Sequence, residues 1–461
     1  MSSNLKFKTQ NSKLQKLTKL LLNWFSRNAR DLPWRRTRDP YAIWVSEIML
    51  QQTQVKTVVP YWKRWMQELP TVKAAADASP DKIHKLWEGL GYYTRVRNLQ
   101  KAAKQIMEKQ GGQFPHNFDD VLALPGIGRY TGGAICSIAF NQPTPILDGN
   151  VIRVLTRVFG IAKNPREKKT NAQLWRLAEE LVTHAKAQST QIKGRDSALR
   201  CPDAAARRPH QNQVGRSQNC SCSFLNQSLM ELGALICTPR NPQCPVCPVK
   251  KLCVAFRENR AAELPNLGRR TATTTRRFIA FVIERNGKFL VRQRPAGVVN
   301  AHLWEFPNVE IGARLSVRTR ARCEDFGVRW QSAATTPLFD CGQNFQSGVA
   351  LRFPPQSKKI WLRLCRVAAV AAQLFGSSPT SINHLCTVKH SITRYRITLE
   401  AFRVQLGGRS STTPKKFGTR RARPSENSGV WLTLARLRDL AFTAAHKKIL
   451  THLKHNGRHL R

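Results

Sequence analysis

Apolar side chains recur at intervals of three and four residues in the first part of the chain, most clearly in residues 14–30 and 40–66. This spacing places the apolar residues on one face of a helix, so the pattern predicts amphipathic helices. We expect residues 1–255 to form a mainly helical domain with an irregular insert at about 185–222.

The pattern changes at about residue 272, where the segment RRFIAFVIERNGKFLVRQRP carries β-forming residues on both sides of Asn286 and Gly287. An Asn-Gly pair between two such runs predicts a tight β-hairpin. We therefore predict a second, α+β domain over residues 272–461, irregular at about 311–380. Residues 256–271, which are polar and contain Pro265 and Gly268, are the predicted connector.

The composition of the chain indicates what kind of partner it binds. The 461 residues include 76 Lys and Arg against 28 Asp and Glu, a formal net charge of +48, with 41% hydrophobic residues. Such a surplus of positive charge indicates a polyanion, and nucleic acid is the first choice. No apolar run reaches the length of a membrane span, and the first residues lack the apolar core of a secretory signal. We expect a protein of a reducing compartment without a membrane partner.

Four of the twelve cysteines stand close together in ICTPRNPQCPVCPVKKLC. Cys237, Cys244, Cys247 and Cys253 have the spacing C-x6-C-x2-C-x5-C, and the prolines between them favour tight turns. Four thiolates in one short loop suit tetrahedral zinc or a [4Fe-4S] cluster, because both require converging deprotonated sulfur ligands. The spacing by itself leaves both possibilities open.

A short glycine-containing turn lies between apolar stretches in LPGIGRYTGGAI, residues 124–135. Gly126 and Gly128 allow backbone amides to approach a phosphate at the start of the next helix, where the helix dipole favours an anion. This is a helix–hairpin–helix signal, although an ordinary connection between two helices has a similar sequence.

Two carboxylates are candidates for chemistry. Glu47 lies in the apolar run DPYAIWVSEIML, and the pattern alone favours a place on the exposed polar face of a helix. If Glu47 were buried instead, desolvation would raise its pKa and make it a candidate general acid. Asp148 precedes Gly149 and Asn150 at the start of a predicted helix, where Asp is a favoured N-cap.

The ordered series LPWR, SEIMLQQTQV, GLGYYTRVRNL, LPGIGRYTG, ILDGNV and NQSLMELGALIC, followed by the cysteine loop, resembles the helix–hairpin–helix DNA glycosylases with an iron–sulfur loop. Among them it is most similar to the MutY-type adenine glycosylases. The resemblance covers residues 20–183 and 224–255. It implies two helical lobes, and it favours a [4Fe-4S] cluster over zinc.

The resemblance also implies a reaction. Glu47 would protonate the adenine ring at N7 and later activate water, and Asp148 would stabilise the oxocarbenium-like sugar. Tyr130 and Asn150 would support these carboxylates. Related endonuclease III enzymes carry a lysine at the position of Tyr130, and a phenol cannot form the Schiff base needed for strand cleavage. The chain would therefore be a monofunctional glycosylase leaving an abasic site, with a bifunctional lyase as the alternative.

Adenine inside a duplex must be extruded before it can be cleaved. By resemblance, Gln52 and Tyr92 would intercalate, Thr53 and Leu90 would contact the opposite base, and Gln227 would contact the adenine. The complete set of predicted DNA-binding and base-binding residues is Arg35, Gln52, Thr53, Leu90, Tyr92, Gly126, Gly128, Gln227 and Thr393.

Residues 272–461 resemble the MutT-like (Nudix-like) domain with which MutY enzymes recognise 8-oxoguanine. A working hydrolase of that fold needs a Glu-rich helix to hold Mg²⁺, and the segment ARLSVRTRARCEDFGV has no such array. The family's Phe-Ser-His loop corresponds here to Ile392, Thr393 and Arg394. Thr393 would keep a hydroxyl group for lesion recognition, whereas the histidine is missing and Arg394 would contact phosphate instead. The alternative is an ordinary strand pair with alternating Ile392, Arg394 and Arg396.

The stretches 185–222 and 311–380 depart from the family pattern, and one hypothesis is that parts of the gene are read in a shifted frame. The predicted substrate is double-stranded DNA with adenine opposite 8-oxoguanine or guanine, in base excision repair. A catalytically impaired DNA-binding relative is the alternative. We expect a monomer in the bacterial cytoplasm at the nucleoid, or in the nucleus or mitochondrion of a eukaryote.

Overall fold

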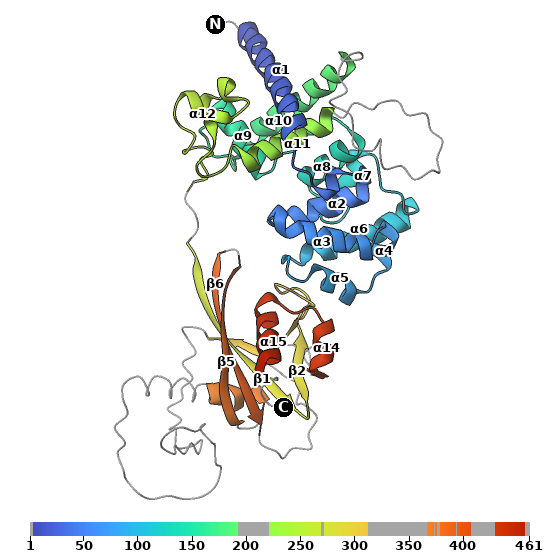
Figure 1. Cartoon of the computed structure of the whole chain (residues 1–461), viewed down its shortest axis with the longest axis vertical. Coiled ribbons are helices and arrows are strands. Elements are labelled where there is room, and N and C mark those ends of the chain that lie inside the picture. Colours follow the sequence, from blue (N-terminus) through green and yellow to red (C-terminus); the bar gives the residue numbers. More distant parts are fainter. Residues whose placement is uncertain are drawn as a thin grey trace, which may run out of the picture. The chain divides into compact units, whose positions relative to one another are not determined.

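The computed structural model describes residues 3–191, 221–268, 272–311, 367–372, 374–375, 379–392, 394–406 and 429–456 (Figure 1). The chain divides into two compact units. Unit 1 contains Met1–Leu86 and Thr94–Arg270, and unit 2 contains Trp87–Tyr93 and Thr271–Arg461. Most of the predicted insert and of the irregular stretch 311–380 lies outside the described residues, so the shifted-frame hypothesis stays open.

Unit 1 is helical, as its apolar periodicity predicts. Its elements are α1 (Ser3–Asn28), η1 (Pro33–Arg35), α2 (Pro40–Leu50), α3 (Val55–Glu68), α4 (Val72–Asp77), α5 (Pro80–Trp87), α6 (Thr94–Gln110), α7 (Phe118–Leu122), α8 (Arg129–Phe140), α9 (Gly149–Phe159), α10 (Lys168–Gln191), α11 (Ser221–Leu235), η4 (Cys244–Val246), η5 (Lys250–Leu252) and α12 (Val254–Arg257).

One core joins helices from distant parts of the unit 1 sequence. In α1 the residues Leu14, Leu17 and Leu21 are buried at intervals of three and four, as expected for one face of an amphipathic helix. They belong to a cluster that α8, α9, α10 and α11 complete. No helix of the described ranges is long and apolar enough to cross a membrane.

Helix α2 differs from its amphipathic neighbours because all nine residues from Tyr41 to Met49 are buried. It lies against α3, α6 and α8. A helix that is apolar on all sides belongs to an interior, where a polar residue must find a partner inside the protein. This buried environment determines the protonation state of Glu47.

The predicted helix–hairpin–helix is confirmed: α7 and α8 are joined by a short turn. Gly126 has a φ of 80°, and a Cβ there would lie 2.6 Å from the Cβ of Asn98, so the turn requires glycine. Gly128 is the N-cap of α8, and a Cβ there would meet no heavy atom within 4 Å. A side chain would therefore have space at Gly128, whereas at Gly126 it would require a shift of Asn98.

The described residues of unit 2 form a mixed seven-stranded sheet in the order β3-β2-β1-β6-β5, in which β4 pairs with β1 and β7 pairs with β2. Strands β1 and β6 are parallel, and the other pairs are antiparallel. The elements are β1 (Thr274–Arg285), β2 (Lys288–Gln293), β3 (Trp304–Glu305), β4 (Asn308–Glu310), β5 (Pro379–Ile392), β6 (Tyr395–Leu406), β7 (Val430–Thr433), α14 (Leu434–Asp439) and α15 (Ala444–Asn456).

The predicted hairpin is present: Arg285 pairs with Lys288 across Asn286 and Gly287. The φ angles of the two turn residues are 52° and 68°, the left-handed conformation that Asn and Gly accept most easily. The sequence signal for this turn is therefore confirmed.

Both faces of the sheet are covered, which explains the continuous apolar run in β1. Ala280 and Val282 pack on the side of α14 and α15, whereas Ile279, Phe281 and Ile283 pack on the other side with Val367 to Ala371. Alternate residues of a strand point to opposite faces, so a sheet buried on both sides needs apolar residues at every position. The predicted fold classes, mainly α and then α+β, are confirmed.

Candidate active site

Glu47 is buried on α2, with only 4% of its surface exposed. The pattern-based prediction of an exposed polar face is therefore wrong. It fails because apolar periodicity marks the buried face of a helix, and α2 has no exposed face on which the carboxylate could lie.

The phenol of Tyr130, on α8, satisfies one carboxylate oxygen of Glu47: its hydroxyl donates to Oε2 at 2.8 Å. Burial raises the pKa of Glu47 to about 7, the hydrogen bond from Tyr130 and the charge of Arg35 oppose this rise, and the charge of Asp148 adds to it. Burial and the two carboxylates raise the pKa of Tyr130 well above its usual range, so the phenol keeps its proton. Glu47 can thus carry a transferable proton at neutral pH.

Asp148 is the N-cap of α9, as predicted: its Oδ1 accepts from the backbone N–H of Val151 at 2.7 Å. Its Oδ2 accepts from Nδ2 of Asn150 at 2.9 Å. Burial raises the pKa of Asp148, and these hydrogen bonds together with Arg153 act against the rise. Asp148 therefore has fixed donors on both oxygens, whereas the hydrogen bond described for Glu47 comes from one phenol.

Arg153 holds the Asp148 end of the site to α11 and to the cysteine loop. Its Nη2 donates to Oδ1 of Asn150 at 2.8 Å and to the carbonyl of Gly233 at 2.7 Å, and its Nε donates to the carbonyl of Cys237 at 2.6 Å. A Cβ at Gly233 would lie 2.6 Å from the Cβ of Asn150. Glycine on α11 thus lets the two helices approach closely at this point.

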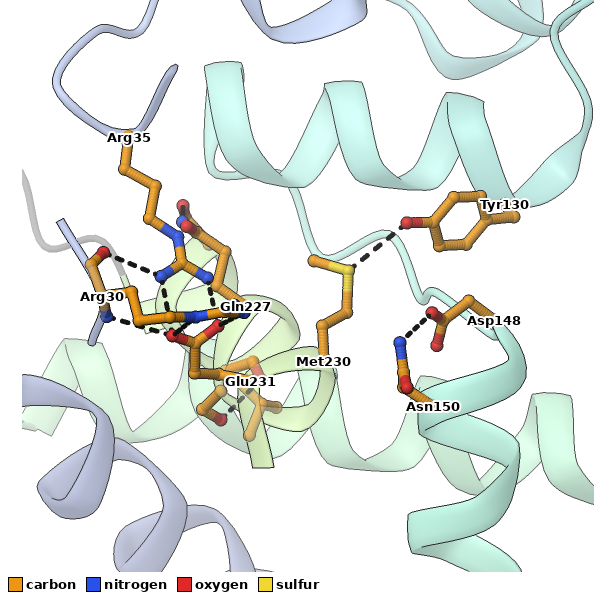
Figure 2. A network of polar contacts seen from close by, with 11 residues as sticks. Arg30, Arg35, Tyr130, Asp148, Asn150, Gln227, Met230 and Glu231 are labelled. Atoms are coloured by element: carbon orange, nitrogen blue, oxygen red, sulfur yellow. Dashed lines mark hydrogen bonds and ion pairs between the residues drawn. The ribbon is translucent and has the colours of Figure 1, made fainter. Parts of the chain in front are cut away.

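Glu47, Tyr130, Asp148 and Asn150 form a first carboxylate cluster. A second carboxylate cluster pairs one buried glutamate with two arginines (Figure 2). Glu231, on α11, is 1% exposed and forms ion pairs with Arg30 at 2.7 Å and Arg35 at 2.9 Å. Burial acts to raise the pKa of Glu231, but the hydrogen bonds and charges of the two arginines reverse this and lower it to about 2. Glu231 is therefore ionised at neutral pH and fixes both guanidinium groups.

The two carboxylate clusters line one cavity of about 600 Å³. Its lining includes Glu47, Tyr130, Asp148 and Asn150 from the first cluster, and Arg30, Arg35 and Glu231 from the second. Figure 2 shows Arg30 and Arg35 around Glu231, and Tyr130, Met230, Asp148 and Asn150 beside them. A proton donor, a capped carboxylate and paired arginines therefore share one cavity.

The sequence of residues 45–180 matches the family described as HhH-GPD superfamily base excision DNA repair protein. The adenine DNA glycosylase of Homo sapiens is 31% identical over 483 residues, which cover 93% of this chain and 72% of the human protein. This chain belongs to the adenine DNA glycosylase family. The adenine DNA glycosylase of Rattus norvegicus is 35% identical, and the match covers 70% of this chain and 66% of the rat protein.

Among solved structures, a thermostable thymine-DNA glycosylase covers 54% of this chain and 99% of its own, with 27% identity and a TM-score of 0.43.

Three residues that family membership makes candidates for base contacts also line the cavity. Gln227 is 7% exposed, and its Nε2 donates to Oγ of Ser223 at 3.0 Å. Gln52 and Thr53 follow the end of α2, and Gln52 has a φ of 58°. A positive φ in a residue other than glycine is uncommon and indicates a backbone held by its surroundings.

Three further predicted DNA-contacting residues are Leu90, Tyr92 and Thr393. Leu90 and Tyr92 lie in the short segment that groups with unit 2. Leu90 is buried, whereas Tyr92 is 41% exposed and has a φ of 49°. Thr393 lies outside the described residues.

The four cysteines of the cysteine loop, Cys237, Cys244, Cys247 and Cys253, line a second, small cavity of about 20 Å³. Nη1 of Arg157 donates to Sγ of Cys237 at 3.3 Å, and Sγ of Cys253 donates to the Arg157 carbonyl at 3.5 Å. Burial, aided by the charges of the other three thiols, raises the pKa of Cys247 to about 12. In the described part of the chain no three Cys, His, Asp or Glu side chains are grouped so that they could hold a metal ion.

The sequence did not single out Arg30, Arg153 or Glu231. Glu231 stands four residues after Gln227 in NQSLMELGALIC, so helical periodicity places both on one face of α11. This four-residue spacing is the sequence signal that indicates Glu231 as a site residue. Its partners Arg30 and Arg35 lie about 200 positions away in the sequence, and only the folded chain brings them together.

Proposed function

We propose that this chain is a monofunctional adenine DNA glycosylase. It hydrolyses the N-glycosidic bond of adenine opposite 8-oxoguanine or guanine in double-stranded DNA and leaves an abasic site. The observation that carries the proposal is Glu47, buried and bonded to Tyr130 in the cavity that Asp148 also lines.

The two carboxylates suit the two needs of this reaction. Adenine is a poor leaving group, so a proton donor with a pKa near 7 at Glu47 promotes its departure. Positive charge then develops on the sugar, and a carboxylate whose oxygens are fixed, as in Asp148, stabilises it without reorganising. Different environments for two neighbouring carboxylates are the usual basis of such a division of roles.

Tyr130 supports the monofunctional outcome. Its phenol remains protonated beside Glu47 and has no amine with which to form a Schiff base. The enzyme therefore hydrolyses the glycosidic bond without cleaving the strand.

A duplex with adenine opposite 8-oxoguanine, fluorescently labelled on the adenine strand, tests this function. Incubation with the protein followed by alkali should cleave the strand at the adenine, and omission of alkali should leave it intact. Glu47→Gln should lower the single-turnover rate at least about 100-fold. Glu179→Gln, an exposed carboxylate on α10, is the matched control and should leave the rate unchanged.

Strand binding without excision would contradict the enzymatic function and support the alternative of an impaired DNA-binding relative. Strand cleavage without alkali would instead support a bifunctional lyase.

The cysteine loop supports a [4Fe-4S] cluster. Membership of the adenine DNA glycosylase family favours the cluster over zinc, and Cys237, Cys244, Cys247 and Cys253, which line one cavity, would supply its four thiolate ligands. A bound cluster would cross-link the loop and hold it against α9. Iron analysis and visible absorbance of the purified protein distinguish the two: zinc without iron contradicts a cluster. Cys247→Ser should lose iron, and Cys386→Ser, in unit 2, should retain it.

We assign lesion recognition to residues 272–461 and catalysis to residues 1–255, with residues 256–271 as connector. Thr393→Ala should reduce the preference for adenine opposite 8-oxoguanine over adenine opposite guanine. An unchanged preference would contradict a role for this hydroxyl. A monomeric state and the cellular location remain predictions from the sequence.

A further inference from the structure

The end of α2 is a strained turn at the edge of the active-site cavity. The helix ends at Leu50, Gln51 is its C-cap, and Gln52 has a φ of 58° before α3 begins at Val55. The last carbonyl groups of a helix have no partners within the helix and must find donors elsewhere. A left-handed glutamine also needs surroundings that hold it.

One side chain from another helix provides these donors. Nη1 of Arg95, the second residue of α6, donates to the carbonyls of Ile48 and Met49 at 2.9 and 3.0 Å. The same nitrogen donates to the carbonyl of Gln51, and Nη2 reaches Oγ1 of Thr53 at 3.4 Å. The guanidinium therefore bonds the open end of α2 and both neighbours of Gln52.

This placement uses two properties of arginine. Its positive charge lies at the negative end of the α2 dipole. Its planar fork presents donors in fixed directions, so the backbone of α2 and the side chain of Thr53 can be bonded at once. A lysine at this position would keep the charge and lose the fork.

We propose that Arg95 is a positioning residue for base extrusion: it holds the turn that keeps Gln52 ready to enter the base stack. The proposal rests on the function proposed above and on the intercalating role expected for Gln52. Without Arg95 the turn relaxes toward ordinary backbone conformations, so the insertion of Gln52 becomes slower while the carboxylates that perform the chemistry keep their partners.

Two duplexes separate extrusion from chemistry. In the first, adenine is opposite 8-oxoguanine and must be unpaired; in the second, it is opposite a tetrahydrofuran abasic analogue and has no pair to break. Arg95→Lys and Arg95→Met should lower the single-turnover rate on the first duplex about tenfold relative to the rate on the second duplex. A change of about tenfold corresponds to the free-energy cost of holding one residue in a strained backbone conformation. Arg97→Met, two residues further along α6, is the matched control and should leave the ratio unchanged.

A fluorescent readout follows extrusion directly. With 2-aminopurine in place of the adenine, and with Glu47→Gln present so that the base is not cut, the rise in fluorescence should be slower for the Arg95 variants. Equal loss on both duplexes, or an unchanged fluorescence rate, would show that Arg95 only caps α2 and would overturn the proposal. Failure of the unmodified protein to excise adenine from either duplex would contradict the proposed function instead.

If Arg95→Met does not fold, as judged by circular dichroism, Arg95→Lys provides the same comparison with the charge and the apolar stem retained.

Discussion

Two buried glutamates line the same cavity, and their pKa values lie far apart. Glu47 is 4% exposed with a pKa of about 7, whereas Glu231 is 1% exposed with a pKa of about 2. Burial acts in the same direction on both. The partners differ: Glu47 accepts a hydrogen bond from a phenol, and Glu231 accepts hydrogen bonds from two guanidinium groups.

This difference teaches that burial alone does not make a general acid. A carboxylate buried beside neutral groups tends to retain its proton, and one buried beside cations loses it. The cavity lining thus contains one carboxyl group that can donate a proton, Glu47, and one carboxylate held in ion pairs, Glu231. These two glutamates are expected to have separate roles, one in catalysis and one in stability.

The largest effect is expected at Asp148. Asn is as good an N-cap as Asp, so Asp148→Asn should keep α9 and the stability of the protein. The negative charge facing the sugar is lost, and the single-turnover excision rate should fall by about 100- to 1,000-fold. Thermal unfolding and excision measured on the same sample check this. A variant that unfolds more easily yet cleaves normally would show that Asp148 only caps the helix.

Glu231→Gln should mainly affect stability. It leaves Arg30 and Arg35 without their carboxylate, and the free energy of unfolding should fall by about 2 kcal/mol; the value is modest because Arg30 is one-third exposed. Urea denaturation of the purified protein provides the measurement. Glu180→Gln, a more exposed carboxylate on α10, is the control.

The same ion pairs predict how stability responds to acid. Because folding lowers the pKa of Glu231, its contribution is present above the unfolded pKa of about 4 and is lost as the pH falls toward about 2. The stability difference between the protein and Glu231→Gln should therefore shrink in that interval. A constant difference down to pH 2 would contradict the low pKa.

The smallest effect is expected at Tyr130. Its hydrogen bond lowers the pKa of Glu47, so Tyr130→Phe should move the alkaline limb of the pH–rate profile to higher pH. The rate at neutral pH should change less than about tenfold, because the phenol does not itself transfer the proton. A shift to lower pH would mean that Tyr130 does not stabilise the ionised carboxylate.

The sequence predicted those features that depend on local signals. The N-cap at Asp148 and the turn at Asn286-Gly287 follow from residue preferences at single positions. The burial of Glu47 did not follow, because its partner Tyr130 is 83 residues away and α2 is apolar on all sides. The parallel pairing of β1 with β6 joins segments more than 100 residues apart, and no local pattern indicates it.

The pH dependence of single-turnover excision tests the central claim, that Glu47 is the acid, most directly. Glu47 donates only when protonated, so the rate on adenine opposite 8-oxoguanine should be constant below about pH 7 and fall tenfold per pH unit above it. In Glu47→Gln the rate should be low and independent of pH over this range. A rate that stays constant up to pH 9 in the unmodified protein, or the same alkaline decrease in the Gln variant, would contradict the account.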